Sequence, residues 1–189
     1  MINTASSYLN ELIRLLSAME IKTRTGEKLS LDEGGKAALH LIRETKTNKA
    51  KAVLVGNGGS AAIASHMQND LCKAVQMRSL VFTEQSLLTA LANDDGYQTA
   101  YETLMTLWAD ADDLLIAISS SGQSENILRC ARAARKAGTR IITFSGFATD
   151  NPLRSLGDVN FYIPSHCYGH VELAHAALSQ FLTDALKDE

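Results

Sequence analysis

Two stretches of small and hydroxyl-bearing residues each follow a short apolar run, and both have the composition of a loop that binds an anion. The first, GNGGSAA (56–62), follows AVLV, and the second, ISSSGQSENI (118–127), completes the run LLIA. Glycine lets backbone N–H groups approach an anion, and a helix that begins beside such a loop adds partial positive charge. Serine hydroxyls supply further donors without fixed charge. These residues favour the binding of a phosphate group.

Both loops also have simpler interpretations. The spacing of GNGGS matches neither GxGxxG nor the Walker pattern, and this loop could be a tight turn with Ser60 as a helix cap. SSSGQS could be a solvated turn, which explains Gly122 but not the density of serines directly after a core strand. Ser121 and Ser124 are three residues apart across a helix start, so both hydroxyls can turn toward one anion. We therefore expect a phosphate site and no nucleotide cofactor.

The elements that must position these loops alternate from Lys51 onward as short apolar runs and helical stretches. Continuous apolar strands separated by helices indicate a parallel sheet that is covered on both faces. Open parallel sheets bind ligands at the carboxyl ends of their strands, where both loops lie. The predicted strands are 52–56, 79–82, 114–119, 140–145 and 159–164, and the predicted helices are 61–73, 99–109, 125–137 and 170–187.

Apolar residues at helical spacing also fill the first 50 residues, which predicts N-terminal helices that cover the sheet or pack against another subunit. A length of 189 residues, 46% of them hydrophobic, favours one domain with a full core. The predicted fold class is therefore α/β, a three-layer sandwich with a parallel five-stranded sheet. We expect a single domain (1–189) made of N-terminal helices (1–50) and an α/β core (51–189).

Composition and charge exclude several classes of protein. The net charge is −3 with both signs interspersed, so we expect no nucleic-acid partner. No run of 18 apolar residues is present, and the N-terminus lacks the pattern of a secretory signal, so we expect no membrane partner. The three widely spaced cysteines predict free thiols in a reducing cytoplasm: Cys72, Cys130 and Cys167.

Together, GNGGSAA and ISSSGQSENI resemble the sugar isomerase (SIS) domain, and more closely the sedoheptulose 7-phosphate isomerase (phosphoheptose isomerase) group. The resemblance covers nearly the whole chain, including LANDDGY (91–97), GTRIITFSG (138–146) and the helix after IPSH. It implies a flavodoxin-like fold, a homotetramer with sites shared between subunits, and a phosphorylated sugar as substrate. It also implies a role in the heptose biosynthesis of lipopolysaccharide or capsule.

The resemblance assigns the binding residues position by position. Asn57 and Asp94 match positions that contact the sugar, and Gly58 and Gly59 belong to the first phosphate loop. The positions that match the phosphate-binding residues of the family are Ser60, Ser119, Ser120, Ser121 and Ser124.

The family's catalytic pattern is a His, a Glu four residues later, and then a Gln and a His eight residues apart. This chain has His66 and Asp70 at the first pair, on one helix face. Asp70 keeps a carboxylate base that is one methylene shorter. The second pair reads Glu172 and Gln180, and Gln180 cannot serve as an acid or base.

A neighbouring His175 lies three residues after Glu172, which suggests it as a further catalytic residue. With His66, Asp70 and Glu172 it would suit Zn²⁺, or acid–base transfer without a metal. His175 could instead be structural. His170 lies at the start of the last predicted helix, next to a loop that reaches the sugar in the family. The family's acidic contact there is Gly169 in this chain.

Two functions follow from these residues. The first is an aldose–ketose isomerase that converts sedoheptulose 7-phosphate to a heptose 7-phosphate by proton transfer through an enediol. Asp70 and Glu172 would carry the proton in this reaction. The second is a phosphosugar-binding or partner-binding SIS protein without catalysis, which the absence of a His at position 180 motivates.

Overall fold

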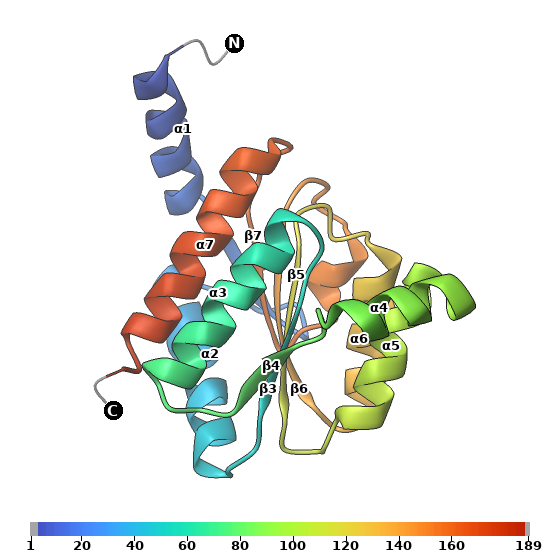
Figure 1. Cartoon of the computed structure of the whole chain (residues 1–189). Helices are drawn as coiled ribbons and strands as arrows, with labels where there is room; N and C mark the ends of the chain where they lie inside the picture. The colour runs from blue at the N-terminus through green and yellow to red at the C-terminus, as the bar shows by residue number, and fades with distance from the viewer. Residues whose placement is uncertain (1–3, 188–189) are drawn as a thin grey trace.

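Five apolar runs form neighbouring parallel strands at the centre of the protein, whose computed structural model describes residues 4–187 (Figure 1). In the strand of residues 114–119, Leu114 and Ile116 pack on one side of the sheet while Leu115 and Ala117 pack on the other. Both sides are covered, so the strands read as continuous apolar runs. The strands are β1 (Glu20–Thr23), β2 (Lys28–Leu29), β3 (Ala52–Val55), β4 (Ser79–Val81), β5 (Leu114–Ser119), β6 (Arg140–Ser145) and β7 (Val159–Tyr162).

Helices form the two outer layers (Figure 1). One core lies between the sheet and α2, α3 and α7, and the other lies between the sheet and α5 and α6. No helix within residues 4–187 is both long enough and apolar enough to cross a membrane. The helices are α1 (Ala5–Ser17), α2 (Leu31–Thr47), α3 (Gly59–Lys73), α4 (Gln85–Leu91), α5 (Tyr97–Trp108), α6 (Glu125–Lys136) and α7 (Tyr168–Asp184), with a π-helical turn at Ala92–Gly96 and a 3-10 turn at Pro152–Ser155.

The predicted α/β sandwich is confirmed, but its sheet has seven strands instead of five, in the order β2-β1-β7-β6-β5-β3-β4. The additional strands β1 and β2 form an antiparallel hairpin inside the segment that we expected to be helical. Strand β1 also pairs antiparallel with β7, with Ile21 opposite Phe161. The hairpin strands are four and two residues long, so they carry too little hydrophobic alternation to be recognised in the sequence.

The five parallel strands have the 2-1-3-4-5 order of flavodoxin-like sheets. In such a sheet the ligand lies where the strand order reverses, at the carboxyl ends of the first and third strands. Here these strands are β3 and β5, which are hydrogen-bonded neighbours. The GNGGS loop leaves β3 and the SSSGQS loop leaves β5, so the topology places both loops side by side.

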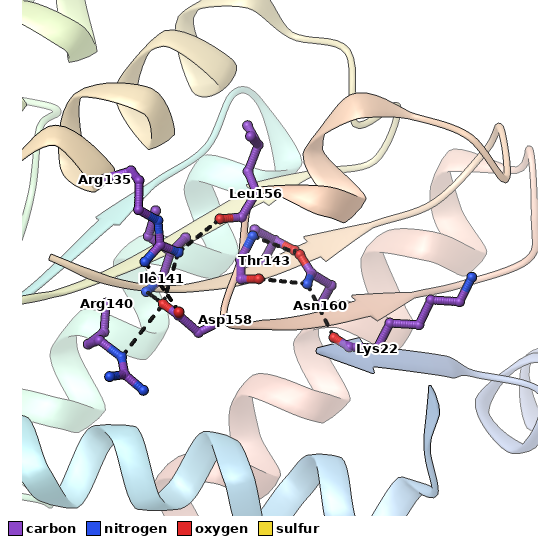
Figure 2. Close-up of polar contacts among 9 residues, drawn as sticks. Lys22, Arg135, Arg140, Ile141, Thr143, Leu156, Asp158 and Asn160 are labelled. Atoms are coloured by element: carbon purple, nitrogen blue, oxygen red, sulfur yellow. Dashed lines mark hydrogen bonds and ion pairs between the residues drawn. The ribbon is translucent and has the colours of Figure 1, made fainter. Parts of the chain in front are cut away.

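Polar side chains fix the hairpin and the amino end of β7 on the sheet (Figure 2). The Asp158 carboxylate accepts a hydrogen bond from the Ile141 N–H at 2.8 Å. The Asn160 carboxamide accepts from the Thr143 hydroxyl at 2.7 Å and donates to the Lys22 carbonyl at 3.2 Å. These bonds join β6, β7 and β1 at the opposite end of the sheet from the two loops.

Candidate active site

The two loops and the start of α7 enclose a cavity of about 110 Å³. The structure brings six of the predicted binding residues together at this place. Glu172, predicted as a catalytic residue, and Tyr168, which the sequence reasoning missed, complete the wall. The cavity is lined by Asn57, Ser60, Ser119, Ser120, Ser121, Ser124, Tyr168 and Glu172.

The serine hydroxyls form the floor of this serine cavity. Ser119 and Ser120 are 4% and 5% exposed, so they can be reached only from the cavity itself. The Ser119 hydroxyl donates to the Ser124 hydroxyl at 3.2 Å and accepts from the Gly122 N–H at 3.2 Å. The Ser120 hydroxyl has no hydrogen-bond partner within residues 4–187. A buried polar group without a partner is destabilising, and a ligand oxygen would satisfy it.

Three helices, α3, α6 and α7, begin at the serine cavity, at Gly59, Glu125 and Tyr168. None of the three N-termini has a side-chain cap among the described residues, whereas α1, α2 and α4 are each capped by an oxygen-bearing side chain. Uncapped N–H groups and the positive ends of the helix dipoles favour an anion. No Lys or Arg is among the described lining residues, so hydroxyls and backbone dipoles would hold the phosphate.

The glycines of the first loop let α3 approach α7 closely. Gly58 has a φ of +54°, which favours glycine, and it directs the chain from β3 into the helix. A Cβ at Gly59 would lie 2.5 Å from the Glu172 carboxylate, so glycine is needed for this contact. The Glu172 carboxylate therefore rests against the first turn of α3, at the positive end of that helix.

A reciprocal pair of asparagines joins the two loops. Asn57 Nδ2 donates to Asn126 Oδ1 at 3.0 Å, and Asn126 Nδ2 donates back to Asn57 Oδ1 at 2.9 Å. The Tyr97 hydroxyl also donates to Asn57 Oδ1 at 2.8 Å, and the Tyr101 hydroxyl donates to the Gly56 carbonyl at 3.0 Å. Asn126 and the two tyrosines were not predicted as site residues, because partners this far apart along the chain carry no local pattern.

A second cavity, of about 220 Å³, lies between α3 and α7. Its walls include His66 and Asp70 from α3 and Gln180 from α7. His66 Nε2 lies 3.6 Å from Asp70 Oδ2, as the spacing of four residues predicts. The serine cavity takes Ser60 and Glu172 from the same two helices, so both cavities lie along one α3–α7 groove.

Several predicted residues lie outside this groove. His175 is fully buried, its Nε2 lies 3.1 Å from the Ser145 carbonyl, and burial lowers its pKa to about 4. It therefore faces the core. Asp94 is exposed in the π-helical turn and accepts a hydrogen bond from Asn93. It lines neither of the two cavities.

The predicted zinc ligands are not assembled within the described part of the chain. His66 and Asp70 line the second cavity, whereas Glu172 lines the serine cavity. No three His, Cys, Asp or Glu side chains among residues 4–187 come close enough together to hold a metal ion. The three-donor set therefore does not fit the geometry of this single chain.

Near the start of α7, the rings of His170 and Tyr8 of α1 are 4.2 Å apart. His170 is 1% exposed, and its Nε2 lies 3.2 Å from the Tyr8 carbonyl. A side chain at Gly169 would collide with the Tyr8 hydroxyl at 2.6 Å. The glycine that replaces the family's acidic contact therefore makes room for α1, and His170 is part of this packing.

Comparison with known proteins identifies the family. A family model described as SIS domain matches residues 7–146. The phosphoheptose isomerase of Helicobacter pylori (strain P12) is 32% identical over 165 residues, which cover 84% of this chain and 85% of the relative. The phosphoheptose isomerase of Syntrophotalea carbinolica is 33% identical over 146 residues, 74% of each chain. The chain belongs to the phosphoheptose isomerase group of the SIS domain family.

Solved structures have the same fold as this SIS protein. Phosphoheptose isomerase GmhA from Neisseria gonorrhoeae has a TM-score of 0.84 at 24% identity, and the match covers 96% of both chains. The phosphoheptose isomerase from Francisella tularensis has a TM-score of 0.84 at 21% identity and covers 97% and 96%. The Vibrio vulnificus NanR protein, complexed with ManNAc-6P, has a TM-score of 0.71 at 14% identity, and the chain spans 60% of it. The resemblance predicted from the two loops is confirmed.

Proposed function

We propose that this SIS protein is an aldose–ketose isomerase that converts sedoheptulose 7-phosphate to a heptose 7-phosphate. The observation that carries the proposal is the succession of two cavities along the α3–α7 groove. One offers hydroxyls and helix N-termini to a phosphate, and the next offers the His66–Asp70 pair to the reacting carbons. The relatives named phosphoheptose isomerase support the same reaction.

The spacing along α3 favours a sugar whose phosphate is far from its carbonyl group. Ser60 lines the serine cavity, and His66 lines the second cavity six residues later. Six residues of an α-helix correspond to about 9 Å along its axis. A chain of several carbons covers this distance, so a 7-phosphate can reach both cavities at once when its carbonyl is at C2.

The reaction transfers one proton between adjacent carbons. The Asp70 carboxylate removes the proton from C1 of the ketose, and the electron pair of the broken C–H bond forms the C1–C2 double bond of the enediol. His66 beside it stabilises the charge that develops on the enediolate oxygen. Asp70 then returns the proton to C2, and the proton of the C1 hydroxyl passes to the O2 oxygen, which gives the aldose. Glu172, one helical turn before Ala176 of the second cavity, carries this second proton. His175 has no part in this scheme because it faces the core.

The zinc ion predicted from the sequence has no part in this scheme. His66 and Asp70 are the two donors that this chain would contribute to a divalent ion, and such an ion would polarise the substrate carbonyl. Because the three-donor set is not assembled in the described residues, the proton transfers above do not use a metal. Dialysis against EDTA should leave the isomerase rate within about twofold of the untreated enzyme. A loss of activity that Zn²⁺ restores would add the ion to the mechanism.

The proposal includes a homo-oligomer with sites near subunit contacts. Helix α1 extends beyond the rest of the molecule (Figure 1) and exposes Leu9 and Ile13. Helix α7 exposes Leu173 and Phe181, so both helices carry apolar surface that a second copy would bury. Light scattering would test for the tetramer that the resemblance implied.

A doubly charged sugar phosphate and three free thiols fit a reducing cytoplasm, which is the compartment we propose.

A second candidate function is binding of a phosphorylated sugar without catalysis. It is favoured by Gln180, which lines the second cavity and cannot titrate. The NanR protein, with ManNAc-6P bound, shows that this fold also occurs in a phosphosugar complex of another kind of protein. Incubation with sedoheptulose 7-phosphate in D₂O separates the two functions. Deuterium in the recovered sugar requires a working base and supports the isomerase, whereas bound sugar without exchange supports the binder.

The assignment of residues is tested by Asp70→Asn and Glu172→Gln. Both changes keep the shape of the side chain and remove its ability to accept a proton. Each should lower kcat by a factor of about 10² or more. Asp112→Asn, the same change at an exposed aspartate that lines neither cavity, should leave the rate unchanged. Full activity of both carboxamide variants would show that the proton is carried by other groups.

A further inference from the structure

A third cavity, the hairpin cavity, has the chemistry of an anion site and lies outside the α3–α7 groove. It occupies about 270 Å³ between the turn of the β1–β2 hairpin and residues 149–155. It is therefore more than twice as large as the serine cavity, at about 110 Å³. Its lining residues are Lys22, Thr23, Arg24, Gly26, Thr149, Asp150, Asn151, Arg154 and Ser155. We propose that this cavity binds a phosphorylated small molecule at a regulatory site separate from the substrate.

Positive charge exceeds negative charge in this hairpin cavity. Lys22, Arg24 and Arg154 contribute three cations, and Asp150 is the only acidic residue among the described lining residues. Within residues 4–187, neither Lys22 nor Arg24 forms an ion pair or a side-chain hydrogen bond. The Lys22 backbone is fixed through Asn160, while its side chain extends away from that network (Figure 2). Two cations are thus available to a ligand, and the Thr149 hydroxyl in the wall adds a further donor.

Arg154 forms a buried part of the wall of the hairpin cavity, and its contacts hold it in place. Its side chain is 8% exposed, and its guanidinium lies 4.0 Å above the Tyr162 ring. One terminal nitrogen donates to Glu20 at 2.5 Å and the other donates to the Thr149 carbonyl at 2.7 Å. Its Nε has no hydrogen-bond partner among the described residues. An unpartnered buried donor on a fixed cation is a feature that a bound anion would complete.

The same segment is bonded to the substrate phosphate loop. The Leu153 N–H donates to the Gly122 carbonyl at 3.1 Å. The Asn151 side chain packs so closely on Gly122 that a Cβ there would have no space, and Asn151 Oδ1 also accepts from the Arg154 N–H at 3.1 Å. A ligand in the hairpin cavity therefore contacts a segment that is bonded to Gly122, which lies between Ser121 and Ser124. Through this contact, a ligand in the hairpin cavity can change the affinity of the serine cavity for substrate.

Equilibrium dialysis with radiolabelled inorganic phosphate tests the site directly. The wild type should bind two phosphates per chain, and the double variant Lys22→Ala with Arg24→Ala should bind one. Lys28→Ala is the matched control, because Lys28 pairs across the hairpin from Lys22 and does not line the cavity. This control should still bind two. A count that is the same in the wild type and in the double variant would overturn the proposal.

A variant of the serine cavity separates this inference from the proposed function. Ser121→Ala with Ser124→Ala should remove the other phosphate and leave the hairpin cavity filled. If the serine cavity bound no phosphate, this variant would match the wild type while the Lys22–Arg24 variant still lost one. In enzyme assays, phosphate inhibition of the wild type should include a component that excess substrate does not relieve. Purely competitive inhibition would overturn the regulatory role.

Discussion

Asn57 and Asn126 exchange two side-chain hydrogen bonds, at 3.0 Å and 2.9 Å, and thereby join the loop after β3 to the first turn of α6. Each loop supplies part of the serine cavity, so the pair sets the distance between the two halves of the phosphate site. Asn126 is 4% exposed, and its partner Asn57 lies 69 positions earlier in the sequence. The pair is thus a structural bond at the wall of the serine cavity.

Replacement of Asn126 by Ala should weaken substrate binding more than chemistry. The change leaves Asn57 without its reciprocal partner and frees one loop from the other. We expect KM for the sugar phosphate to rise about tenfold while kcat changes less than threefold, with a stability loss of about 1–3 kcal/mol. Steady-state kinetics and urea unfolding measure both effects. A fall in kcat at constant KM would mean that the pair serves the reacting end of the groove instead.

Glu172→Gln should tighten the binding of phosphate while it abolishes turnover. The wild-type carboxylate lies at the first turn of α3, inside the cavity that receives the dianionic phosphate. Removal of its charge removes the repulsion, and the carboxamide keeps the shape. The inhibition constant for inorganic phosphate, or its dissociation constant by calorimetry, should fall about tenfold, or about 1.4 kcal/mol. Glu44→Gln, at an exposed position on α2, should change neither quantity. Weaker phosphate binding by Glu172→Gln would contradict the placement of this carboxylate.

His175 should make folding sensitive to mildly acidic pH. Its pKa in the folded protein is lowered to about 4 because burial disfavours the charged ring, against an ordinary value of 6.5. Between these values the unfolded chain binds the proton and the folded chain does not, so stability falls as pH decreases from 6.5 to about 4. The loss should reach roughly 3 kcal/mol at the lower limit.

Denaturant unfolding at several pH values checks this slope. His175→Gln, which retains a donor for the Ser145 carbonyl, should flatten the pH dependence over this range. His40→Gln is the control, because His40 is exposed on α2 and its removal should leave the slope in place. An unchanged slope in His175→Gln would show that other groups cause the acid sensitivity.

Asp158→Ala should destabilise the protein without altering substrate affinity. The Asp158 carboxylate accepts from the Ile141 N–H and pairs with Arg135 at 3.0 Å, at the end of the sheet opposite the serine cavity (Figure 2). Its loss leaves a buried N–H unpaired, which should cost about 2–4 kcal/mol. Asp112→Ala, at an exposed position, should cost far less. A changed KM in Asp158→Ala would indicate that the two ends of the sheet are coupled.

Elements whose signal in the sequence is local and repeated lie where they were predicted. Strands β5 and β6 begin and end where their apolar runs do, because burial on both faces makes the entire run apolar. The serines of the two loops meet because parallel strands place their carboxyl ends on one edge of the sheet. The 2-1-3-4-5 strand order depends on pairing between distant segments, so the residues of any one strand do not specify it.

The features that the sequence did not predict depend on distant partners. The strands of the β1–β2 hairpin are too short to show a hydrophobic period. The hairpin is held on the sheet because β1 pairs with β7, with Ile21 opposite Phe161. The position of His175 in the core, and of Glu172 in the groove, depends on the rotation of α7 about its axis. Both residues were candidates on the same helix face, and only the packing of α7 on the sheet separates them.

If the serine cavity binds the phosphate of the substrate, Ser120→Ala should separate two effects of that serine. The Ser120 hydroxyl is buried without a partner among the described residues, so its removal should raise the stability by about 1 kcal/mol in the absence of ligand. The same change removes a phosphate donor, so KM for sedoheptulose 7-phosphate should rise about tenfold. A variant with unchanged KM and reduced stability would show that this hydroxyl serves the fold and not the phosphate, and it would contradict the account.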